Sequence, residues 1–248
     1  MDKFRGVKSF RVFYENPTPE QQLKLADYGL VIMEANFLTK EMVKTIKSKG
    51  ALVVGYLSTM QANEAVPYLN QLRTSDYFHV KGVPYRFPQW KSYQMDISQA
   101  HYRSILLSEY KRLIMGLGLD GVFFDTVADI AEKDHFTAND KAKQHAGLLQ
   151  LIADIRATNT EGLIIQNRGF HTLRYHSCLH VDGIMWEDFH DAAGQWTLDR
   201  MQEIKNIQAL KGLTVLSDVK TQSDFDFSKN ASYVPWLNPL GEAGYKIC

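Results

Sequence analysis

Short apolar segments alternate with longer amphipathic segments along this chain. The apolar segments are rich in β-branched and aromatic residues, which favour strands, and most are apolar at nearly every position. Eight such segments are present, at residues 10–14, 30–34, 52–57, 121–125, 163–167, 183–187, 213–218 and 232–236. Strands of this kind are typical of a parallel sheet that has helices on one face and a barrel interior on the other. The pattern therefore predicts an α/β fold, a single (β/α)8 TIM barrel.

The gaps between these segments have the pattern of helices. Thr18 followed by Pro19 is typical of a helix start. Apolar residues recur at helical spacing in segment 99–117, and segments 39–49, 139–156 and 198–210 repeat the pattern. We find no fixed repeat, low-complexity tract or linker, so one domain is expected over residues 1–248.

One connection is longer than a β/α unit needs. The residues between Leu57 and Gly121 include many aromatic side chains and a candidate short strand at 93–97. The aromatic residues in question are Tyr77, Phe78, Tyr85, Phe87 and Trp90. A loop after the third strand lies at the carboxyl face of a barrel, where barrel enzymes bind substrate. We therefore interpret it as part of the binding site; the alternative is an excursion without function.

The composition of the chain argues against several classes of binding partner. The 28 basic and 28 acidic side chains balance, which predicts neither nucleic-acid nor membrane binding. No apolar segment approaches the ~20 residues of a transmembrane helix. The two cysteines, Cys178 and Cys248, form no disulfide framework. The first residues lack the apolar region of a secretory signal, so the sequence as written is expected to be cytoplasmic, or extracellular if a leader has been removed.

Two segments share a sequence pattern that places a carboxylate at the end of a strand. Asp120–Asp125 and Asp182–Glu187 each read Asp-Gly, three apolar residues and a carboxylate, at the ends of the fourth and sixth strands. Strand ends in a barrel meet at one mouth, so Asp125 and Glu187 are expected to converge there, partly desolvated. Such a pair suits glycosidic cleavage, with retention at a separation of ~5–5.5 Å and inversion at ~6.5–9.5 Å. The alternative is that each acid caps a helix.

Further side chains near the predicted strand ends complete the expected substrate site: Tyr14, Glu34, Tyr56, Asp96, Asp129, Asn167, Arg168, Asp188, Asp218 and Trp236. The aromatic members are candidates for stacking on sugar faces. Asn167 and Arg168 are candidates for binding sugar hydroxyls or orienting an acid. Asp129 is as well suited to capping the next helix.

The histidines give only a weak metal signal. His176, Cys178 and His180 are ligand types at alternate positions, but no other ligand cluster accompanies them. The other histidines considered are scattered and are expected in surface or loop roles: His135, His145, His171 and His190. Nucleotide-binding and serine-hydrolase motifs are missing too. The sequence therefore predicts no metal and no cofactor.

Five motifs together resemble glycoside hydrolase family 114, the endo-α-1,4-polygalactosaminidase-like barrels. In chain order they are VVGYLS (53–58), YQMDIS (93–98), GVFFDTVAD (121–129), IIQNRG (164–169) and DGIMWEDF (182–189). The resemblance spans nearly the whole chain. It implies endo-cleavage of an α-1,4-linked galactosamine polymer by Asp125 and Glu187. By analogy with barrels whose nucleophile ends strand four, Asp125 is expected as nucleophile and Glu187 as general acid/base, although the reverse stays open.

The chemistry of a galactosamine substrate also suggests roles for other acids. Asp96, Asp129, Asp188 and Asp218 are expected to offer negative charge to the galactosamine amine. An oligo- or polysaccharide is the expected partner, and the chain is expected to be a monomer. Two alternatives remain: a carbohydrate-binding barrel without activity, and a glycosidase of the same fold that acts on a different glycan.

Overall fold

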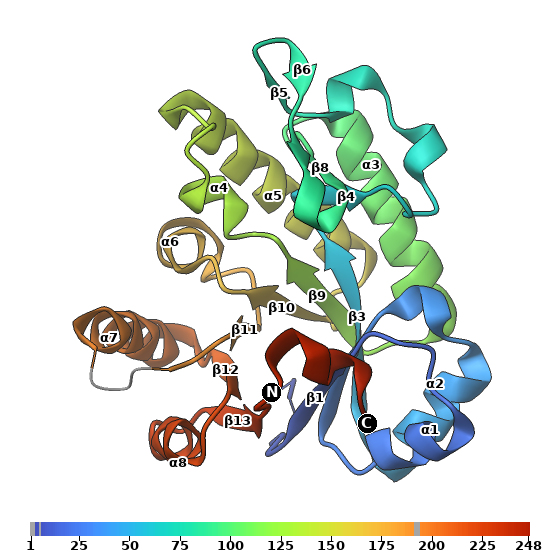
Figure 1. The fold of residues 1–248 in the computed structure, drawn as a ribbon, viewed down its shortest axis with the longest axis vertical. Helices are drawn as coiled ribbons and strands as arrows, with labels where there is room; N and C mark the ends of the chain where they lie inside the picture. Colours follow the sequence, from blue (N-terminus) through green and yellow to red (C-terminus); the bar gives the residue numbers. More distant parts are fainter. Residues whose placement is uncertain (1–2, 5, 191–193) are drawn as a thin grey trace.

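The main sheet of the protein has eight parallel strands (Figure 1). The structure is a computed structural model that describes residues 3–4, 6–190 and 194–248. In sheet order the strands are β1 (Phe10–Phe13), β2 (Leu30–Met33), β3 (Leu52–Ser58), β9 (Gly121–Asp125), β10 (Leu163–Asn167), β11 (Gly183–Trp186), β12 (Thr214–Val219) and β13 (Val234–Leu237). Contacts between β1 and β13 nearly close the sheet on itself. The predicted (β/α)8 barrel is therefore confirmed.

All eight predicted strands are present, two of them with the predicted ends and the others with ends that differ by at most two residues. The largest difference is at the last strand, which was predicted at 232–236 and runs over Val234–Leu237. Ser232 has a φ of 62°, in the left-handed region, so this residue belongs to the turn before the strand.

The helices follow the strands in alternation. The predicted ones are found as α1 (Pro19–Leu25), α2 (Lys40–Ile46), α3 (Ala100–Glu109), α5 (Ala138–Thr158) and α7 (Gln195–Lys211). As expected, Thr18 caps α1: its side chain accepts the backbone N–H of Gln21. Helix α8 (Gln222–Asn230) was not predicted, because Ser228 is its one fully buried residue and its apolar pattern is weak. Among the described residues, no helix is both long and apolar enough to cross a membrane.

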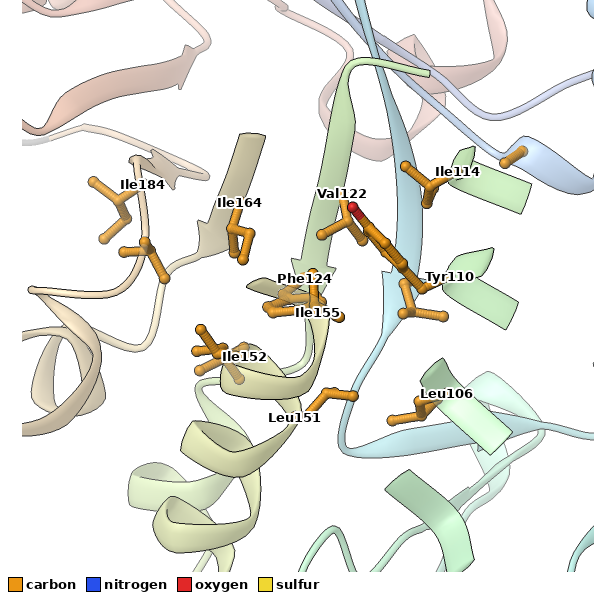
Figure 2. Close-up of a cluster of buried hydrophobic side chains, with 14 of the residues drawn as sticks. Leu106, Tyr110, Ile114, Val122, Phe124, Leu151, Ile152, Ile155, Ile164 and Ile184 are labelled. Carbon is orange, nitrogen blue, oxygen red and sulfur yellow. The ribbon is translucent and has the colours of Figure 1, made fainter. Parts of the chain in front are cut away.

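The core consists of two clusters, one on each face of the sheet. Inside the barrel, side chains such as Phe10, Leu30, Phe123 and Met185 pack together. Outside it, Val122, Phe124, Ile164 and Ile184 of the sheet pack against helical side chains (Figure 2). The helical side chains in that contact include Leu106, Tyr110, Leu151, Ile152 and Ile155.

The alternation between these clusters fixes the direction of the strand-end acids. In β9, Val122 and Phe124 belong to the outer cluster and Phe123 to the inner one. Because successive side chains of a strand point to opposite faces, Asp125 points inward like Phe123. The same reasoning places Glu187 on the inner face, because Met185 is inside.

Trp186 points to the outer face of the sheet. This residue precedes Glu187, is 2% exposed and packs in the outer cluster, as its position in the alternation predicts.

The long connection after β3 forms small sheets of its own beyond the carboxyl end of that strand (Figure 1). One sheet joins β4 (Gln61–Asn63), β8 (Ser92–Gln94) and β7 (Arg86–Phe87), and the other pairs β5 (His79–Val80) with β6 (Val83–Pro84). The short strand predicted at 93–97 is thus β8, displaced toward the N-terminus.

The aromatic side chains of this connection pack largely among themselves and on the segment before α5. Tyr85 stacks on His135 at a centroid distance of 4.1 Å, and Phe78 contacts Phe136 at 4.5 Å. Trp90 is 52% exposed, which leaves its ring open to solvent. The interpretation of the connection as a binding loop remains a prediction.

The contact between α5 and the segment before α3 gives a test of the packing. Ala in place of Gly usually stabilises a helix interior by about 1 kcal/mol. A Cβ at Gly147 would instead overlap with the carbonyl carbon and oxygen of Ile97. We expect Gly147→Ala to lower the free energy of unfolding by ~1–3 kcal/mol, measured by urea denaturation. Lys143→Ala, at an exposed position of the same helix, serves as control. A Gly147→Ala variant at least as stable as the wild type would contradict the packing.

Candidate active site

Four consecutive strands deliver polar side chains to the mouth of the barrel. Asp125 ends β9, Asn167 ends β10, Glu187 follows β11 and Asp218 lies in β12. Each comes two residues after a side chain of the inner cluster, and β-alternation therefore points it inward. Parallel strands end at the same rim, so these four side chains meet there.

Asn167 joins the two predicted catalytic acids. Its Nδ2 donates to Asp125 Oδ1 at 2.9 Å and to Glu187 Oε2 at 3.0 Å. Because both oxygens lie within about 3 Å of one nitrogen, they are no more than about 6 Å apart. The other oxygen of Asp125 accepts from the Tyr56 hydroxyl at 2.8 Å. The acid pair therefore converges as predicted, held by neutral donors.

A tyrosine that the sequence analysis did not identify completes the network. The hydroxyl of Tyr245 lies 2.7 Å from Glu187 Oε1 and 2.7 Å from Asp218 Oδ2. A hydroxyl has a single proton to donate. When it donates to one carboxylate, the second contact is a hydrogen bond only if the other carboxyl group is protonated. Both short contacts of the Tyr245 hydroxyl are therefore hydrogen bonds when Glu187 and Asp218 share one proton.

Burial favours this protonated state. Asp218 is 2% exposed, and burial raises its pKa to about 6 against the opposing effect of hydrogen bonds from Tyr245 and Asn238. The negative charge of Glu187 raises it further. Burial also raises the pKa of Glu187, while hydrogen bonds from Asn167 and Tyr245 lower it and the charge of Asp125 raises it. A carboxyl group with a raised pKa is able to deliver a proton.

Tyr14 and Glu34 border this network. The ring of Tyr14 makes edge contacts with Tyr56 at 5.1 Å and with Tyr245 at 5.5 Å. Burial, followed by the charges of Asp125 and Glu187, raises the pKa of Tyr14, so its hydroxyl stays neutral. The charge of Glu34 also raises the pKa of Tyr14. The Glu34 carboxylate itself accepts hydrogen bonds from the backbone N–H and the side-chain amide of Asn36.

Asp129, Arg168 and Asp188 follow the strand ends, as predicted. Asp129 accepts from Gln61 at 2.7 Å, and burial raises its pKa. Arg168 has a φ of 46°, and its backbone N–H donates to Met185. Asp188 forms an exposed ion pair with Lys220 at 2.6 Å.

Two predicted site residues are committed to protein contacts elsewhere. Asp96 accepts from Ser98, Gln99 and Gln144 near the start of α3, so its carboxylate holds this turn. Trp236 is 5% exposed and lies in the inner cluster against Phe10, so protein already covers most of its ring.

Sequence reasoning missed Tyr245 and Asn238 because both lie beyond the strands that carry the acids. Tyr245 belongs to the 3₁₀ segment η8 (Gly241–Lys246) after the last strand. Asn238 donates to Asp218 at 3.2 Å and packs so closely on Gly244 that a Cβ there would overlap it. No pattern in the sequence identifies Tyr245 as a site residue. The only hint is Gly244 before it, which allows the close contact with Asn238.

The barrel and its desolvated acid pair define an enzyme of the glycoside hydrolase class. The sequence pattern of glycoside-hydrolase family GH114 matches residues 7–216, and the chain belongs to this family. The resemblance drawn from the five motifs is therefore confirmed.

Solved structures share the fold at low identity. The glycoside hydrolase domain of PelA from Pseudomonas aeruginosa is 19% identical, with a TM-score of 0.76 over 98% of each chain. Ega3 from Aspergillus fumigatus, in complex with galactosamine, is 15% identical, with a TM-score of 0.70 over 93% of this chain and 90% of that one. No curated protein matches the chain.

The raised pKa of Asp218 predicts a pH-dependent stability. Its folded pKa of about 6 exceeds the unfolded value of 3.8, so the folded state binds more protons between these values. The stabilisation is present below about pH 4 and is lost as the pH rises through about 6. We expect Asp218→Asn to remove a difference of about 2 kcal/mol between pH 4 and pH 8, measured by urea denaturation. Asp226→Asn, at an exposed position, is the control. Equal pH slopes in wild type and Asp218→Asn would refute the shift.

Proposed function

We propose that this glycoside hydrolase cleaves an α-1,4-linked galactosamine polysaccharide internally and with retention of anomeric configuration. The observation that carries the proposal is the Asn167 bridge, which holds oxygens of Asp125 and Glu187 no more than about 6 Å apart. This upper bound on the separation of the two facing oxygens lies below the ~6.5–9.5 Å of inverting enzymes, which favours retention.

In the first step, Asp125 acts as the nucleophile. It attacks the anomeric carbon while Glu187 gives its proton to the glycosidic oxygen, so the glycosidic bond breaks and a glycosyl ester forms on Asp125. Tyr56 and Asn167 hold the attacking carboxylate, each through one hydrogen bond. Burial raises the pKa of Glu187, which favours the protonated form that this step needs.

In the second step, Glu187 acts as a base. It takes a proton from water, the hydroxide adds to the anomeric carbon, and the bond to Asp125 breaks. The ionised Glu187 that precedes this step accepts hydrogen bonds from Asn167 and Tyr245. The two donors therefore stabilise the ionised form that acts as the base, whereas burial favours the protonated form that acts as the acid.

Two observations support an amino sugar as substrate. Acidic side chains surround the pair, with Asp129 and Asp218 buried and Asp188 at the exposed edge. A cationic amine is attracted by such a set of carboxylates. The fold relative Ega3 was solved in complex with galactosamine, which favours the same sugar here.

The test is reducing-end release from defined α-1,4-galactosamine oligomers. We expect both Asp125→Asn and Glu187→Gln to lower kcat by ~100- to 10,000-fold, because each removes one half of the acid–nucleophile chemistry. Asp226→Asn serves as the control for handling and folding. Proton NMR of the first product is expected to show the α-anomer, whereas the β-anomer would overturn retention. Activity on another glycan alone would overturn the substrate, and binding without turnover would favour a carbohydrate-binding barrel.

Tyr245 gives an independent test of the assignment of Glu187. Its hydrogen bond lowers the pKa of Glu187, so Tyr245→Phe is expected to raise that pKa. Since the general acid must keep its proton, the alkaline limb of the kcat/KM profile is expected to move to higher pH. Tyr28→Phe, at a partly exposed position, is expected to leave the profile unchanged. An alkaline limb that stays in place or moves to lower pH would argue against Glu187 as the acid.

A further inference from the structure

Three histidines that are distant in sequence lie together outside the acid network. His145 belongs to α5, His171 to α6 (Phe170–Thr172) and His176 to the π-helical segment η7 (Leu173–Ser177). One potential ligand atom from each lies within 4.8 Å of the others. His145 is 4% exposed, His176 is half-buried and His171 is exposed, so solvent reaches the cluster from one side.

The π-helical turn explains why two of them share a face. His171 and His176 are five residues apart, a spacing that an ordinary α-helix does not place in one row. In η7 the closure is i to i+5, as in the 2.9 Å hydrogen bond from the Cys178 N–H to the Leu173 carbonyl. This wider turn brings both imidazoles to the side that faces α5. π-Turns of this kind are frequent at functional sites.

The three imidazoles lie close together, two of them stacked face to face. The rings of His145 and His176 stack at a centroid distance of 3.8 Å, and His171 lies 6.1 Å from His145. Thr172 contacts Nε2 of His145 at 3.1 Å and fixes the ring, a role that partners of metal-binding histidines commonly have. Within the described parts of the chain, the ring nitrogens of His171 and His176 make no hydrogen bond.

The electrostatic setting favours neutral imidazoles, the form that binds metals. Burial lowers the pKa of His145 to about 4, and the neighbouring His176, His171 and Lys141 lower it further. Burial also lowers the pKa of His176. Three neutral nitrogens on a small patch suit zinc and related ions, with a water as fourth ligand.

We propose that His145, His171 and His176 bind one divalent transition-metal ion, with Zn²⁺ as the expected species. Tetrahedral zinc at about 2.0–2.1 Å from each nitrogen needs nitrogens about 3.4 Å apart. Metal binding therefore requires the exposed His171 and the half-buried His176 to rotate from the present spread of at most 4.8 Å, with His176 leaving its stack on His145. The ion connects α5 to the segment after β10, the strand that carries Asn167. Its role is structural, because the cluster shares no residue with the acid network.

The test uses the full chain without a polyhistidine tag, after EDTA treatment and removal of the chelator. We expect one equivalent of Zn²⁺ to bind, measured by competition with a chromophoric chelator, and Tm to rise with zinc concentration. His171→Gln and His176→Gln are each expected to weaken binding at least ~100-fold, because each removes a ligand. His180→Gln changes an exposed histidine just beyond the π-turn and is expected to bind as the wild type does.

A second measurement requires no variant. Zn²⁺ added to the wild-type chain is expected to shift the imidazole ¹⁵N resonances of three histidines together, at a one-to-one ratio. The proposal is overturned if the wild type does not bind zinc below about 0.1 mM, a value far weaker than structural zinc sites. It is also overturned if both variants keep wild-type affinity, or if His180→Gln loses binding to the same extent.

Discussion

The active site depends on one amide group placed between two carboxylates. Whenever both acids are ionised, their negative charges lie no more than about 6 Å apart and repel each other, and burial strengthens the repulsion because the dielectric around them is low. The Nδ2 of Asn167 carries two N–H bonds, one for each acid, so a single neutral group offsets the repulsion without neutralising either charge. The position of this amide follows from the strand order: β10, whose last residue is Asn167, lies between β9 and β11.

The part of the network formed by Tyr245, Glu187 and Asp218 holds a proton. Tyr245 contacts two carboxyl groups through one hydroxyl, and both of those groups have a raised pKa. Asp125, the proposed nucleophile, instead accepts hydrogen bonds from Tyr56 and Asn167. Two acids at the same rim therefore have different surroundings, and this difference is the basis of the different roles proposed for them.

Local sequence patterns predict much of this arrangement. The apolar segments mark the strands, and the two-residue alternation determines that Asp125 and Glu187 point inward while Trp186 points outward. What the sequence did not reveal depends on contacts between distant segments. Tyr245 reaches the site from beyond the last strand, and the three histidines meet through a π-turn that has no sequence signature. The contacts of Asp96 were also not foreseen: its carboxylate accepts hydrogen bonds from Ser98 and Gln99 of its own turn, and its part in substrate binding stays a prediction.

The residues around the two acids come from distant parts of the chain. Asp125, Asn167 and Glu187 lie on neighbouring strands or directly after them, whereas Asn238 and Tyr245 lie after β13, the last strand of the barrel. The hydrogen bond that lowers the pKa of Glu187 from this side therefore comes from the 3₁₀ segment η8. Changes confined to this segment can alter the acidity of Glu187 while Asp125, Asn167 and the strands that carry them stay in place.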